Sequence, residues 1–142
     1  KVVALAALMP IVAGIGGNSG NQTITLIIRS LALGQVNASN ARRLVAKELS
    51  IAALNGIVWG GIAGAFAWWL YNDTPQGVTL GLTMTLAMIL NLLVGAIIAM
   101  AVPLGLERLG RDPALGSSVL LTFTTDSMGF FIFLGLASIF FR

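Results

Sequence analysis

The sequence predicts an all-α membrane protein built as a bundle of four transmembrane helices. Of its 142 residues, 57% are hydrophobic and only 9% are charged, and the mean hydropathy is +0.94. Soluble domains carry about 25% charged residues, so this composition argues against one. Four apolar stretches exceed the roughly 18 residues that cross a bilayer. They are residues 2–28, 51–71, 78–102 and 114–141, and we treat residues 1–142 as one transmembrane domain.

The first stretch has a polar motif at its centre, GGNSGNQT (residues 16–23), where lipid tolerates polar groups least. Gly14, Gly17, Asn21 and Thr25 follow one another at intervals of three, four and four residues, which places them along one line of a helix. We expect this line to face a water-filled cavity, with glycines that bring the backbone close to its contents and loosen the helix. The alternative is that these polar groups only join helices by hydrogen bonds.

The second and third stretches are interpreted as packing helices. Gly56, Gly60 and Gly64 recur every four residues, a spacing that lets another helix approach closely. Asn91, in the third stretch, is interpreted as an interhelical hydrogen-bonding group rather than a ligand.

The connection after the first stretch predicts a separate element. Residues 35–50 are amphipathic and too polar to span, so we expect a short interfacial helix on the inner membrane surface, with a solvated connector as the alternative. The positive-inside rule places loops 29–50 and 103–113 in the cytoplasm and Asp73 outside. Both ends of this chain are then outside a cell (inner) membrane. The basic residues of these two loops are Arg29, Arg42, Arg43, Lys47, Arg108 and Arg111.

Several function classes are disfavoured. The net charge of +3 and the pI near 10.2 come from scattered basic residues without an aromatic platform, so we expect no nucleic-acid partner. The sequence has no Cys and no His, which removes thiolate and imidazole ligands and the usual base of a serine protease. An aspartyl protease needs two intramembrane acids, and we find one per chain. We therefore expect no enzyme.

Asp126 is that one acid, and it lies about midway along the fourth stretch. A carboxylate at this depth costs roughly 2.5 to 3.5 kcal/mol on insertion scales and usually faces a bundle interior or water. Ser118, Thr122 and Asp126 follow at intervals of four, and Gly129 comes three residues later, which predicts a second polar line. Asp112 and the proline after it are expected to begin this helix.

These ligands favour a hydrated divalent cation. Only hard oxygen donors are present, which suits Mg²⁺, Ca²⁺ or Mn²⁺ better than copper or zinc. One carboxylate per chain cannot neutralise such an ion, whereas two copies on a two-fold axis supply two Asp126 side chains. The charge count therefore predicts a homodimer. Mg²⁺ is typically held through one or two carboxylates and keeps several waters.

Two segments, MPIVAGIGGNSGNQTITLIIRSLALGQV (9–36) and DPALGSSVLLTFTTDSMGFFIFLGLA (112–137), resemble the transmembrane domain of MgtE-type magnesium channels. The resemblance implies a homodimer with five helices per subunit and a pore lined by the second and fifth. This chain would hold helices two to five. It also implies cytoplasmic regulatory domains, including CBS domains, that are absent from this chain.

By the same resemblance, Asp126 matches the pore aspartate that holds hydrated Mg²⁺ from both subunits. Ser118 departs from the family pattern, in which Asn is familiar. The implied metal-site residues are Asp126, Asn21, Thr25, Gly14, Gly17, Thr122 and Ser118.

The predicted function is a channel that moves hydrated Mg²⁺ down its electrochemical gradient through a homodimeric pore. The alternative is a Na⁺- or H⁺-coupled divalent cation carrier that uses Asp126 in alternating access. A third class is a non-conducting membrane scaffold. Sequence does not separate Mg²⁺ from Mn²⁺ or Co²⁺ as the physiological ion.

Overall fold

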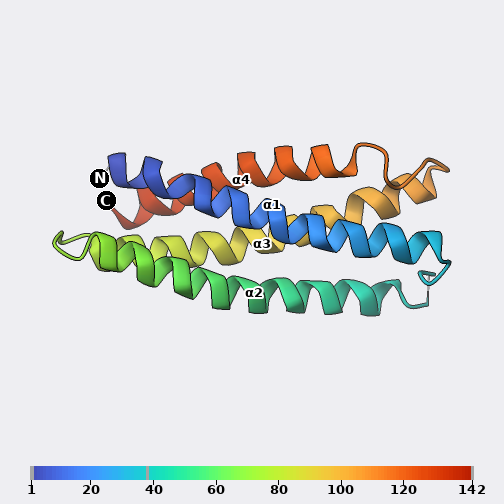
Figure 1. Cartoon of the computed structure of the whole chain (residues 1–142), viewed down its shortest axis with the longest axis horizontal. Coiled ribbons are helices and arrows are strands. Elements are labelled where there is room, and N and C mark those ends of the chain that lie inside the picture. The colour runs from blue at the N-terminus through green and yellow to red at the C-terminus, as the bar shows by residue number, and fades with distance from the viewer. Residues whose placement is uncertain (1, 38, 142) are drawn as a thin grey trace.

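The computed structural model describes residues 2–37 and 39–141, which form four antiparallel helices (Figure 1). No strand occurs among these residues, and each helix is long and apolar enough to cross a membrane. The predicted all-α membrane bundle is confirmed, and the chain is a multi-pass membrane protein. The helices are α1 (Val2–Ala32), α2 (Ala41–Leu70), α3 (Gly77–Arg108) and α4 (Ser117–Phe140).

α3 is the central helix. It packs against α1, α2 and α4, whereas α1 packs against α4 and hardly touches α2. The larger apolar cluster fills the space between α3 and its neighbours with fully buried side chains such as Val12, Met88 and Phe133. α2 is therefore held to the bundle mainly through α3, while α1 and α4 form a pair on its other side.

Glycines seal the contact between α2 and α3, as their spacing predicted. A Cβ on Gly56 would lie 2.8 Å from the Ile89 Cα, and one on Gly64 would lie 2.6 Å from the Gly81 carbonyl oxygen. Both distances are too short for any side chain. The Thr85 hydroxyl of α3 also donates to the Gly60 carbonyl of α2 at 2.9 Å, so a side-chain hydrogen bond joins the two helices.

The expected separate interfacial helix is not found. Residues 41–50 are the first turns of α2, and the preceding residues make a short turn. The reason is local: the Asn40 amide donates to the Gln35 carbonyl and the Asn37 backbone N–H donates to Asn40 Oδ1, which closes the turn. After it, no Gly or Pro interrupts the helix until Gly56. Arg29 and Arg108 similarly lie in the last turns of helices rather than in loops.

Two further expectations about helix geometry were wrong. Asp112 does not begin the last helix; its carboxylate accepts the Ala114 N–H in a turn, and α4 starts at Ser117 after Gly116, which has φ +69°. That left-handed residue separates the turn from the helix. The glycines of α1 also leave it a continuous helix over Val2–Ala32, and neighbouring helices pack against three of them, Gly16, Gly17 and Gly20.

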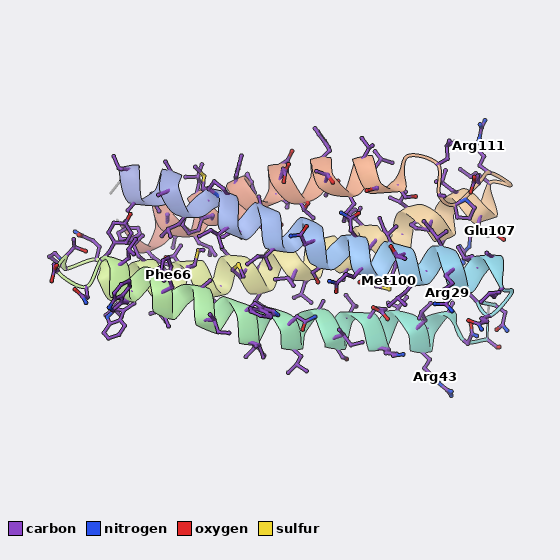
Figure 2. The ribbon with its side chains drawn as sticks, in the orientation of Figure 1. Arg29, Arg43, Phe66, Met100, Glu107 and Arg111 are labelled. Atoms are coloured by element: carbon purple, nitrogen blue, oxygen red, sulfur yellow. The ribbon has the colours of Figure 1, made fainter. Side chains whose placement is uncertain are left out.

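Charge is distributed unequally between the two ends of the bundle. Figure 2 shows Arg29, Arg43, Glu107 and Arg111 at the end where α1 joins α2 and α3 joins α4, with Phe66 nearer the other end. The turn at that other end, between α2 and α3, contains Asp73. The bundle is thus basic at one end, an arrangement typical of a membrane protein with a fixed orientation.

Candidate functional site

The three helices α1, α3 and α4 meet near the middle of the bundle. A Cβ on Gly17 would lie 3.2 Å from Thr125 Oγ1, and one on Gly20 would lie 2.7 Å from a Leu121 methyl group. α4 therefore runs antiparallel to α1, with Thr125 beside Gly17, near the midpoint of α1 (Val2–Ala32). Asp126 follows Thr125 directly, so its backbone lies at mid-depth.

Asp126 faces outward from the chain. Its side chain is exposed, and it has neither a hydrogen bond nor an ion pair with any residue in the described ranges 2–37 and 39–141. Thr125, by contrast, is fully buried, and its hydroxyl donates to the Leu121 carbonyl. The carboxylate is thus free to meet water, an ion or another chain.

Ser118 and Thr122 are exposed on the same line of α4 as Asp126. Gly129 does not belong to that line: it is buried, and a Cβ there would lie 3.1 Å from the Ala13 Cα. It continues the packed face that contains Ser117, Leu121 and Thr125, which recur every four residues. Gly129 follows Asp126 by three residues rather than four, and this difference places it on the neighbouring face of the helix.

The expected line on α1 is divided in the same way. Gly14 and Thr25 are exposed and Asn21 is half-buried, but Gly17 is buried against Thr125. A Cβ on Gly14 would have no atom within 4 Å. Gly14, Asn21 and Thr25 therefore lie on the accessible side of α1, whereas Gly17 is placed to let α4 approach.

One hydrogen bond joins the two lines. The Ser118 hydroxyl donates to Asn21 Oδ1 at 2.9 Å, from α4 to α1, and the Thr25 hydroxyl donates to the Asn21 carbonyl at 2.9 Å. The Asn21 side chain is therefore held by Ser118, with its amide nitrogen left as a donor. The polar edges of α1 and α4 consequently form one surface, which can offer hydroxyls, an amide and a carboxylate to a hydrated ion.

Sequence reasoning missed Asn18. It is exposed, and it lies four residues after Gly14 and seven before Thr25, on the same face of α1. The signal was present in the spacing, since a line drawn through Gly14 at intervals of four and seven includes it.

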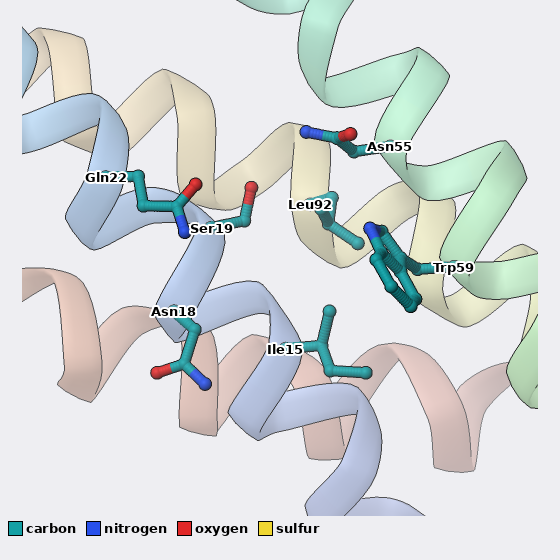
Figure 3. A pocket seen from close by; sticks show the side chains of 7 residues that line it. All are labelled: Ile15, Asn18, Ser19, Gln22, Asn55, Trp59 and Leu92. Atoms are coloured by element: carbon teal, nitrogen blue, oxygen red, sulfur yellow. The ribbon is translucent and has the colours of Figure 1, made fainter.

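A second polar surface lies between α1 and α2. A cavity of about 300 Å³ opens there, and Figure 3 shows side chains of α1 and α2 arranged around it, with the Asn18 amide turned away from α2 in this view. No acid lines the cavity, so it lacks the charge that a divalent cation requires. Part of the GGNSGNQT motif therefore faces away from Asp126. The lining residues are Ile15, Asn18, Ser19, Gln22, Asn55, Trp59 and Leu92.

A single chain does not enclose a metal by itself. Within the described residues, no group of three His, Cys, Asp or Glu side chains gathers in one place. On α4, the one carboxylate of Asp126 shares its exposed line with the hydroxyls of Ser118 and Thr122. A divalent cation there would need a second carboxylate from elsewhere.

Comparison with known proteins gives a consistent result. The sequence profile of the MgtE family, described as divalent cation transporters, matches residues 9–136. Proteins named magnesium transporter MgtE are similar over nearly all of this chain: 36% identical over 96% of it in Thermus thermophilus, and 32% over 99% in Bacillus subtilis. A third, from Enterococcus faecalis, is 31% identical over 97% of it. The chain spans 29–30% of the length of these relatives.

Proposed function

The chain belongs to the MgtE family of divalent cation transporters, a family of transporters rather than enzymes, and we propose that it forms the membrane pore of a magnesium channel. Two copies assemble as a homodimer, and hydrated Mg²⁺ moves down its electrochemical gradient between them. The observation that carries this proposal is the unpaired, exposed carboxylate of Asp126 at mid-depth of an apolar bundle.

A carboxylate in this position needs compensation. Facing lipid it would cost roughly 2.5 to 3.5 kcal/mol, and no described residue neutralises it. A second copy related by a two-fold axis would bring two Asp126 side chains to one watery passage. Two negative charges match one divalent cation, which accounts for both the dimer and the ion class.

Neutral groups around the carboxylate suit an ion that keeps its water. Mg²⁺ sheds water reluctantly, so its ligand shell is expected to meet the protein through hydrogen bonds. Ser118, Thr122, Asn21 and Thr25 can exchange such bonds with the waters, and the open backbone at Gly14 can accept them. Gly17 contributes by packing rather than by contact. The same set would also admit Mn²⁺ or Co²⁺.

We assign the basic end of the bundle to the cytoplasm, by the positive-inside rule. Both ends of this chain then lie outside an inner membrane. Because the chain contains no Cys, a single cysteine at Asp73 or Arg111 can be labelled with an impermeant reagent. Labelling of position 111 from outside would reverse the assignment.

The test compares Asp126→Asn with Asp73→Asn in liposomes. Asp126→Asn removes two charges per dimer, and the Mg²⁺ over K⁺ flux ratio should fall at least about tenfold because the ion loses its Coulomb attraction. Asp73→Asn removes an acid in the exposed end turn and should leave the ratio unchanged. Unaltered selectivity in Asp126→Asn, or transport by a monomer, would count against the channel. Strict dependence on a Na⁺ or pH gradient would favour the coupled carrier.

A further inference from the structure

Asn91 lies at the centre of α3, and its side chain is fully buried. Its Nδ2 donates to the Val12 carbonyl of α1 at 3.0 Å and to the Thr125 carbonyl of α4 at 3.2 Å. Its Oδ1 has no hydrogen-bond partner in the described part of the chain. The predicted interhelical role is confirmed, and one amide group is found to connect three helices.

Glycines on both neighbouring helices make room for this amide. A Cβ on Gly16 of α1 would lie 2.4 Å from Asn91 Nδ2, and a Cβ on Gly129 of α4 would lie 3.0 Å from the same atom. Any larger residue at either position would displace the amide or the helix. Asn91 therefore occupies a site whose shape is set from two sides.

The two carbonyls do not need Asn91. Both lie inside continuous helices, α1 and α4, where each carbonyl already accepts a backbone hydrogen bond from its own helix. An apolar side chain of the same size would also avoid burying an unpaired Oδ1, which is costly. The amide is consequently poor as a purely stabilising choice. Its specific effect is geometric, because it fixes α1 relative to α4 at one depth.

That depth is the level of Asp126. The carbonyl held by Asn91 belongs to Thr125 and is part of the peptide bond to Asp126. Val12 is similarly two residues from Gly14, the open backbone position on α1. Fixing both carbonyls from α3 therefore fixes where the carboxylate and the Gly14 backbone lie relative to each other.

We propose that Asn91 is a positioning residue for the cation pathway: it holds α1 and α4 at the offset that directs Asp126 and the Gly14 backbone into one space. This inference rests on the function proposed above. It goes beyond helix packing, because it requires that loss of the amide change the ion selectivity exerted by Asp126 rather than stability alone.

Asn91→Leu tests the proposal, with Thr83→Val as the matched control. Leu has the same branching as Asn but is larger, and it removes the donor. Thr83 is equally buried on α3, but its hydroxyl donates to Thr79 within its own helix and joins no other helix. In liposomes, Asn91→Leu should lower the Mg²⁺ over K⁺ flux ratio about two- to tenfold, whereas Thr83→Val should preserve it.

A cycle with Asp126→Asn distinguishes positioning from packing. If Asn91 acts through the carboxylate, Asn91→Leu should have no further effect on the ratio once residue 126 is neutral. An additive effect, or an unchanged ratio in the single variant, overturns the proposal. If Asp126→Asn itself leaves the ratio unchanged, the channel function fails first. Should Asn91→Leu not fold, Gly16→Ala displaces the amide from the α1 side, and the same cycle applies.

Discussion

Glycines allow close packing in two helix contacts, between α2 and α3 and between α1 and α4, but the two contacts have different surroundings. In the first, Gly56, Gly60 and Gly64 are all buried, and the Thr85 hydroxyl that meets them is hydrogen-bonded within the contact. In the second, Gly17 and Gly20 pack closely, but an exposed polar edge runs beside them from Ser118 to Asp126 and along α1. One contact closes the bundle, and the other brings two polar edges together at its surface.

This difference shows what small-residue spacing can and cannot indicate. Small residues every four positions predict a close helix contact in both places. Whether a contact is purely structural depends on the polar residues next to the small ones in the sequence. It also depends on whether hydrogen bonds within the chain satisfy these polar groups. The Asn91 amide nitrogen donates to two carbonyls, whereas Asp126 has no partner among the described residues.

The largest expected effect concerns the closed contact. Gly64→Ala would put a methyl group 2.6 Å from the Gly81 carbonyl oxygen and even closer to Thr85 Oγ1, so α2 must separate from α3. We expect a loss of about 3 kcal/mol or more in the free energy of unfolding, measured in detergent.

Gly61→Ala is its control, because that glycine is exposed on the same helix with no atom within 4 Å. It should be neutral or stabilising by up to about 1 kcal/mol through helix propensity. Equal destabilisation by both variants would contradict the assignment of Gly64 to a sealed contact.

Much of the fold could be predicted from the sequence, because bilayer thickness and hydropathy fix helix number almost alone. Hydropathy identified the four apolar stretches. The four-residue spacing of Gly56, Gly60 and Gly64 predicted their close contact, and the amide of Asn91 predicted its interhelical hydrogen bonds. The helix ends could not be predicted as well. Local turns closed by Asn40 and Asp112 determine them, and their hydrogen bonds have no signature in hydropathy.

The sequence pattern assigned residues to two polar lines, and the structure exposes some of these residues and buries others. Spacing alone assigned Gly129 and Gly17 to polar lines, although both are buried in the contact between α1 and α4. Helices that cross shift their contact face gradually along their length, so a residue three positions from an exposed one can be packed. Asn18 is a different case, because it is exposed and its spacing from Gly14 already placed it on the same face.

A smaller effect is expected at the bond between the two polar edges. Asn21→Ala and Ser118→Ala each remove the 2.9 Å hydrogen bond between α1 and α4. Interhelical bonds in membranes contribute about 0.6 kcal/mol on average, so the double-mutant cycle on unfolding should give a coupling of that size. Thr122→Ala, whose exposed hydroxyl has no partner among the described residues, should show no coupling with Asn21→Ala. Equal coupling energies for both pairs would show that the bond between Ser118 and Asn21 is not what couples α1 to α4.

The smallest change in stability, with a selective effect on transport, is expected at Gly14. Gly14→Ala adds one methyl group where no atom lies within 4 Å, as does Gly135→Ala on α4. Both should keep or raise stability by up to about 1 kcal/mol, since alanine is the better helix former. Only Gly14 borders the polar edge of α1, so only its methyl group would enter the proposed pathway and lower Mg²⁺ flux. Equal flux through both variants would place the pathway away from α1. The exposed polar edge of α1 beside α4 would then have to face something other than the transported ion.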